Sequence, residues 1–156
     1  MAVKSFKEFL MEQMENKNPR NIVKKHADKK GYTIGPVYHG SNKDFNIFKE
    51  YESAMGVFWF SEDRDKIEQG ESGASSTKFI KPFYLKVKKV AGWDEYEKLG
   101  LGEIEDRGFD AIKLDDDYIM FNPESIKSAD IVTYKDNGDM ISLKQRFDSG
   151  SDDVRY

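Results

Sequence analysis

The spacing of apolar residues in this chain changes at Gly31, and this change limits the folds open to it. Before Gly31 the apolar residues recur every three or four positions, which is the spacing of an amphipathic helix. After Gly31 apolar and polar residues alternate, as at Phe83, Leu85 and Val87, which is the spacing of a half-buried strand. A short helical segment ahead of a strand-rich body predicts an α+β fold with a mixed or antiparallel sheet.

Residues 1–30 are expected to form two helices. The first has Ser5 as its N-cap and carries four apolar residues on one face: Phe6, Phe9, Leu10 and Met14. The second runs from Pro19 to Lys30 and ends at Gly31, a residue type common at helix ends. Residues 1–30 are thus predicted to be an N-terminal helical segment, either packed on the body or separable from it. Residues 31–145 are expected to form the main domain, and residues 146–156 a C-terminal tail.

Turn signals set the order of elements in the main domain. Strands are expected at 36–39, 56–60, 79–90, 109–114 and 118–121, and a further hairpin joins 131–134 to 140–143. One helix is expected to open at Ser61 and end near Gln69, and one or two short helices lie within 93–107. The small and polar stretch 70–77 is predicted to be a loop able to act as a lid. The acidic run 115–117 is predicted to be a tight turn.

Charge and cysteine content narrow the classes of function. The 156 residues suit one domain, and no apolar run approaches the ~18 residues of a membrane span. The chain has no cysteine and only two histidines, which excludes a disulfide framework, thiolate metal sites and an all-histidine zinc site. Metal-free chemistry in the cytoplasm is therefore expected.

The net charge is −4, yet residues 1–30 carry more Lys and Arg than Asp and Glu, so the rest of the chain is acidic. An acidic body argues against a general nucleic-acid binder, and the basic stretch 17–30 is either a solvated helix face or a weak phosphate contact.

Three separated positions carry groups suited to chemistry. His39 ends the first predicted strand, Trp59 lies in the strand that leads to Ser61, and Asp117 leads the strand Tyr118 to Phe121. Each position also has a plain structural interpretation. His39 can be a hydrogen-bonded residue at a strand end, and Trp59 a core aromatic. Asp115 and Asp116 are interpreted as turn residues.

This order resembles the His–aromatic–acid triad of the diphtheria-toxin-like and poly(ADP-ribose)-polymerase-like branch of the ADP-ribosyltransferases. It is most similar to the small ADP-ribosyltransferase domains of bacteriophage polyvalent proteins. The motifs that carry the resemblance are Tyr38-His39-Gly40-Ser41, Gly56 through Ser61, Asp117 through Ala129, and the endings 141–148 and 153–156. The resemblance covers residues 31–156 and implies a split sheet with short flanking helices.

The resemblance also implies a role for each position. Asp117 takes the place of the catalytic acid, His39 binds a ribose hydroxyl, and Trp59 stacks on the nicotinamide ring of NAD. The Gly40 backbone pairs with the nicotinamide carboxamide, and three further residues complete the NAD-binding set: Ser41, Phe58 and Ser61. The chain departs from the family in having Asp117 for glutamate, Trp59 for tyrosine, and no aromatic at Gln69 or Gly70. Phe58, Phe79 or Tyr84 is expected to supply that second aromatic face.

The implied activity is mono-ADP-ribosyl transfer from NAD to a host macromolecule, protein or nucleic acid, by a metal-independent monomer. Two alternatives stay open: a catalytically degenerate binding or inhibitory module of the same fold, and an NAD glycohydrolase. Residues 1–12 resemble the head-targeting peptides of internal phage proteins, which are cut after sequences such as Leu10-Met11-Glu12. This resemblance implies packaging in the phage head and delivery to the host cytoplasm.

Overall fold

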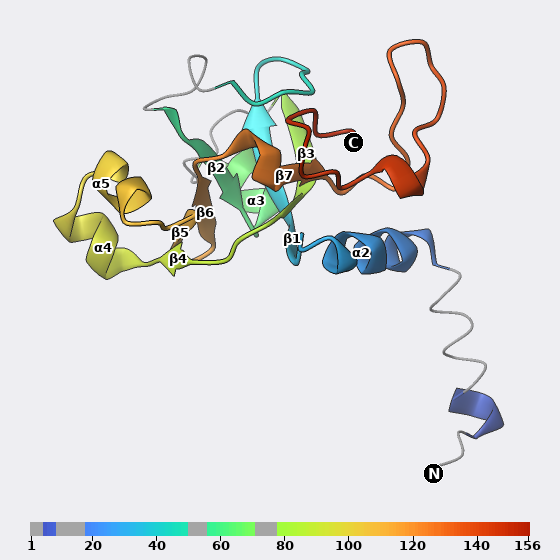
Figure 1. The fold of residues 1–156 in the computed structure, drawn as a ribbon, viewed down its shortest axis with the longest axis horizontal. Coiled ribbons are helices and arrows are strands. Elements are labelled where there is room, and N and C mark those ends of the chain that lie inside the picture. Colours follow the sequence, from blue (N-terminus) through green and yellow to red (C-terminus); the bar gives the residue numbers. More distant parts are fainter. Residues whose placement is uncertain (1–4, 9–17, 50–55, 71–77) are drawn as a thin grey trace.

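A seven-stranded mixed sheet, in the order β4-β5-β6-β2-β1-β3-β7, forms the centre of the protein (Figure 1). The structure is a computed structural model that describes residues 5–8, 18–49, 56–70 and 78–156. The strands are β1 (Ile34–Ser41), β2 (Phe58–Ser61), β3 (Phe79–Leu85), β4 (Val90–Ala91), β5 (Ala111–Leu114), β6 (Asp117–Met120) and β7 (Ile126–Ser128). All neighbours are antiparallel except β4 and β5, which run parallel. The chain therefore has an α+β fold, as its sequence predicts.

The helices are short and lie outside the sheet. They are α2 (Pro19–Lys29), α3 (Arg64–Glu68), α4 (Trp93–Lys98) and α5 (Leu101–Asp106), with 3-10 turns η3 (Pro123–Ser125) and η4 (Leu143–Gln145). The predicted helix from Pro19 is confirmed, and Asn18 caps it by accepting a hydrogen bond from the Arg20 N–H at 3.0 Å. Among the described residues no helix is long and apolar enough to cross a membrane.

The sheet is weakly joined in its middle. Strand β1 pairs with β3 along most of its length, whereas its register with β2 consists of the pair Tyr38 and Ser61. The sheet is therefore two parts that meet at this pair: β1, β3 and β7 on one side, and β2, β6, β5 and β4 on the other. We call the line between β1 and β2 the seam.

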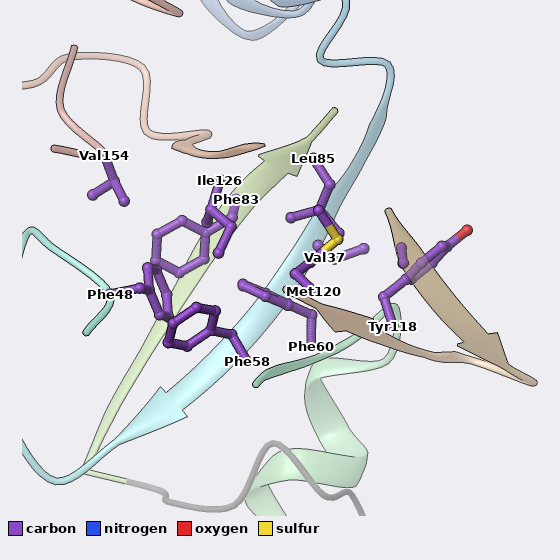
Figure 2. Close-up of a cluster of buried hydrophobic side chains, with 11 residues drawn as sticks. Val37, Phe48, Phe58, Phe60, Phe83, Leu85, Tyr118, Met120, Ile126 and Val154 are labelled. Atoms are coloured by element: carbon purple, nitrogen blue, oxygen red, sulfur yellow. The ribbon is translucent and has the colours of Figure 1, made fainter. Parts of the chain in front are cut away.

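Strand alternation sends side chains of the sheet into two separate cores. One core gathers aromatic rings from three strands and a loop, and Figure 2 shows Phe48, Phe58 and Phe83 close together in it. The other core contains Ile112, Ile119 and Phe121 with Trp59 packed against them, next to the residues of α4 and α5. We call these the phenylalanine core and the helix-covered core.

The long strand predicted over 79–90 is wrong, because the chain leaves the sheet after Leu85. The backbone N–H groups of Lys88 and Lys89 donate to the Asp110 carboxylate, at 2.6 Å and 2.9 Å. These bonds hold the chain in a bend, after which Val90 and Ala91 rejoin the sheet beside β5. The predicted hairpin over 131–143 forms in a short version. Tyr134 and Met140 make an antiparallel bridge, and beside it the Lys135 N–H donates to the Asp139 carbonyl at 2.7 Å and the Ile141 N–H to the Thr133 carbonyl at 2.8 Å.

Residues 146–156 pack on the body instead of forming a tail. The side chains of Phe147 and Val154 are buried, with exposed fractions of 1% and 5%. The Arg146 guanidinium donates to the carbonyls of Ser128 and Asp130, both at 2.9 Å. The segment is therefore part of the fold.

Candidate functional site

Strands β1, β2 and β6 place part of the predicted site on one face of the sheet. Ser61 lies opposite Tyr38 on β1 and opposite Asp117 on β6. Because side chains two apart on a strand share a face, Trp59 lies on the face of Ser61 and Asp117. By the same alternation Gly40 lies on the face of Tyr38. The structure thus brings Trp59, Ser61 and Asp117 together beside the seam.

His39 projects from the opposite face. Its imidazole lies in the phenylalanine core, with ring centroids 5.0 Å from Phe48 and 5.4 Å from Phe60. The expected His–Trp–Asp triad therefore does not converge on one face. His39 and Asp117 can act on the same ligand only if that ligand enters the seam.

The His39 imidazole bridges the seam through its Nδ1 atom, which lies 2.7 Å from the Trp59 carbonyl oxygen. A carbonyl only accepts, so Nδ1 carries the hydrogen and the neutral ring keeps its lone pair on Nε2. Burial lowers the pKa of His39, although the bond to Trp59 acts in the opposite direction. His39 is therefore neutral at pH 7. The hydrogen-bonded role that the sequence left open fits this geometry.

The cavity next to His39 is small. It measures about 10 Å³ and is lined by His39, Ser41, Lys43, Phe45, Phe79, Lys81 and Phe83. This volume holds about one water molecule. Ser41 shapes the turn here, because its Oγ accepts a hydrogen bond from the Lys43 N–H at 3.1 Å. A nucleotide would require the loops around this cavity to open.

A larger hollow lies at the Asp117 end of the site. It is open to solvent, measures about 470 Å³ and is lined by Tyr38, Glu62, Asp63, Arg64, Asp65 and Asp116. Lys66 on α3 binds Asp116 in the turn, with Nζ 2.6 Å from Oδ2. That hydrogen bond lowers the pKa of Asp116, and it also raises the pKa of Lys66, to which the nearby Asp117 adds. The acidic turn is thus partly neutralised by Lys66, to which Lys113 adds a smaller effect.

Two of the predicted cofactor-binding residues are occupied elsewhere. Phe58 is 2% exposed and packs in the phenylalanine core, with its ring centroid 5.2 Å from that of Phe48, so it offers no stacking surface. Ser61 is fully buried, and its Oγ accepts from the Asp63 N–H at 3.1 Å, which helps to start α3.

The missing second aromatic face is not supplied by Tyr84. That residue is buried in a third cluster with Val23, Ala27, Tyr32 and Phe147, away from the seam. Phe79 lines the small cavity at His39. Trp59 is partly buried against the helix-covered core, so the core interpretation of this residue also holds.

Residues 71–77, predicted to form a lid, lie outside the described residues. Within the part of the chain that the structure describes, no group of three or more His, Asp or Glu side chains is arranged to hold a metal ion. Sequence analysis assigned Tyr38 no role beyond its place in the Tyr38–Ser41 motif and gave no sign of Lys66, because their positions beside the site depend on the strand register and on the packing of α3 next to the turn.

Comparison with protein-family models, with curated proteins and with solved structures finds no match to this chain. Its functional assignment therefore rests on the residues and geometry of the site.

Proposed function

We propose that this protein is a mono-ADP-ribosyltransferase that uses NAD to modify a host macromolecule, within an ADP-ribosyltransferase-like split-sheet fold. One observation carries the proposal. At the seam, where β1 and β2 share the pair Tyr38 and Ser61, Asp117 and Trp59 lie on one face and His39 bridges the two strands. A ligand contacts all three residues only if it enters the seam, because the His39 ring projects from the opposite face.

Each residue then has a chemical task in the proposed reaction. The bond between nicotinamide and ribose breaks with both electrons leaving on nicotinamide, and positive charge develops on the ribose. The Asp117 carboxylate stabilises that charge and takes the proton from the acceptor as the acceptor bonds to the ribose carbon. The Trp59 ring faces the cationic nicotinamide. Gly40 has no side chain to block the ligand, and its buried backbone is reached only when the ligand enters the seam.

His39 suits the ribose in this proposal because it is neutral and its Nδ1 hydrogen is already used. Its Nε2 lone pair can accept a hydrogen bond from a ribose hydroxyl. A neutral imidazole also avoids placing a positive charge beside the developing cation.

A second candidate is a degenerate module of the same fold that binds a partner without catalysis. The observation that favours it is the setting of His39, whose ring lies among phenylalanines on the face opposite Asp117. An NAD glycohydrolase, which would transfer ADP-ribose to water, stays the third alternative.

The experiment uses NAD labelled in its adenylate phosphate, incubated with the full chain and a bacterial lysate. We expect label to move onto a macromolecule, and Asp117→Asn to lower the rate by about 10²-fold or more, since charge stabilisation and proton removal are both lost. Asp115→Asn is the matched control, because it makes the same change in the same turn. NAD affinity, measured by calorimetry, should stay close to that of the wild type in both variants.

Three results would redirect the assignment. Equal loss in the Asp115 and Asp117 variants would indicate a structural effect of the turn. Release of free ADP-ribose without transfer would indicate the glycohydrolase. If a chain that still folds shows neither transfer of label nor release of ADP-ribose, the binding module would be favoured.

A further inference from the structure

His26 on α2 has an unusual environment. Its Nε2 atom is buried and has no hydrogen-bond partner in the described part of the chain. The ring is tilted against Phe147, with centroids 6.1 Å apart. A neutral imidazole tolerates such a position far better than a charged one, because a buried charge needs a partner.

The interface that contains His26 is small. Val23 and Ala27 are the buried residues of α2, and they pack on Tyr32, Tyr84 and Phe147. Figure 1 shows α2 at the start of β1, beside the sheet and not across either face. A helix held by so few apolar contacts can be detached by one unfavourable charge.

The charges that act on His26 are positive. Lys29 and Lys30 come from its own helix, and Arg146 comes from the C-terminal segment packed against it. Burial is the largest cause of the lowered pKa of His26, and these three cations lower it further.

Acidic groups also lie around this interface. Asp28 on α2 pairs with Lys24 at 3.2 Å and acts on the Tyr84 hydroxyl of β3, and Asp130 and Asp148 act through space on Arg146 and on the Tyr32 hydroxyl. The charged groups that act on His26 are the three cations, so an imidazolium here would have cations as its charged neighbours and a buried Nε2 without a partner.

We propose that α2 is a pH-sensitive attachment, which leaves the body when His26 is protonated and uncovers the apolar surface formed by Tyr84 and Phe147. Gly31 provides the pivot. It follows the C-cap residue Lys30 and has a φ of +92°, a conformation in which glycine is favoured.

The sign of the effect follows from proton linkage. Release of the helix removes the burial and the effect of Arg146, so the pKa of His26 rises toward its ordinary value of 6.5, above its value in the docked helix. The docked form therefore binds fewer protons, so docking is complete above pH 6.5 and weakens as the pH falls through that value. One proton changes the docking equilibrium by at most about tenfold per pH unit.

Amide hydrogen exchange of the full chain at pH 7.5 and pH 5, corrected for intrinsic exchange rates, tests the proposal. We expect the α2 amides of the wild type to lose protection about tenfold or more at the lower pH, while β3 amides keep theirs. In His26→Phe, which cannot be protonated, the α2 amides should keep their protection at both values. In His26→Gln, which keeps a polar side chain but cannot be protonated, the α2 amides should likewise keep their protection at both values.

Three outcomes overturn the proposal: α2 protection that does not change with pH, the same loss in His26→Phe as in the wild type, or simultaneous loss in α2 and β3. The last would be global unfolding. The His26→Gln variant keeps the test decisive if His26→Phe does not fold, because a loss of α2 protection at the lower pH in that variant contradicts the proposal.

Discussion

His39 shows how one residue can serve both the fold and the candidate site. It closes the phenylalanine core and satisfies the Trp59 carbonyl at the seam, where the β1–β2 ladder ends. Because its pKa is lowered in the folded state, the unfolded chain binds the extra proton first as the pH falls. Its contribution to stability is present in full above pH 6.5 and is lost as the pH falls through that value and below.

We therefore expect His39→Gln, which retains a donor but does not titrate, to reduce the loss of stability between pH 7.5 and pH 5. Urea unfolding at pH 7.5 and at pH 5 measures the free energy of unfolding at each pH, and the difference is the loss of stability. The pKa of His26 is lowered as well. Adding His26→Phe to the His39→Gln chain removes the contribution of His26 to the pH dependence and so separates it from that of His39. A pH dependence equal to that of the wild type in His39→Gln would contradict this account.

At the scale of elements, strand β7 is tied to the C-terminal segment by a buried lysine. The Lys127 side chain is inaccessible to solvent, and its Nζ donates to the carbonyls of Ser151 and Asp153, at 2.5 Å and 3.4 Å. Burial lowers the pKa of Lys127 from 10.5 to about 8. Between these two values the unfolded chain binds more protons than the folded chain, so this group makes stability rise with pH.

We expect Lys127→Met to lack that rise, and chemical unfolding at pH 8 and pH 10 measures it. The methionine keeps much of the buried volume but removes the donor of the Ser151 carbonyl, whereas the Asp153 carbonyl still accepts from the Tyr156 N–H, so about 1–3 kcal/mol of stability should be lost at pH 8. Lys144→Met in η4 is the control, because it removes one exposed lysine. A rise with pH that survives in Lys127→Met would assign the effect to another group.

Local sequence signals predicted where the helices, strands and turns lie better than they predicted which of these elements contact one another. The helix from Pro19, the turn before Asp117 and the short helices over 93–107 depend on neighbouring residues, and they were found from sequence. The bend after Leu85 depends on Asp110, far along the chain, and the packing of Val154 depends on Asn46, whose carbonyl accepts its N–H at 2.8 Å. Such long-range contacts leave no local pattern.

The candidate site was predicted only in part, because its geometry also depends on contacts between distant residues. The order of His39, Trp59 and Asp117 was visible, but their faces depend on strand register. One signal was available: Val37 and His39 are two residues apart, so a core position for Val37 directs His39 toward the core as well. Phe58 and Trp59 are consecutive on β2, so their side chains point to opposite faces of the sheet. The prediction that both contact one ligand was therefore wrong for Phe58.

At the scale of the whole molecule, the N-terminal segment and the body differ in how they are held. Ser5 to Glu8 are exposed, and Phe6 keeps 76% of its surface accessible, whereas α2 buries Val23 and Ala27 against the body. The predicted apolar positions Phe9, Leu10 and Met14 lie outside the described residues. The separable segment proposed from the sequence is therefore expected to end before Asn18.

Two shortened chains test where that boundary lies. A chain that begins at Asn18 keeps the cap and all of α2, so its thermal midpoint should stay within a few degrees of the full chain. A chain that begins at Gly31 loses the burial of Val23 and uncovers Tyr84 and Phe147. Full burial of one such side chain contributes about 1.5–3 kcal/mol, and about 1 kcal/mol shifts the midpoint of a domain of this size by ~2–8 °C. We therefore expect a fall of several degrees or more for the Gly31 chain alone. A comparable fall for the Asn18 chain would show that residues 1–17 belong to the fold, and it would remove the basis for a detachable targeting peptide.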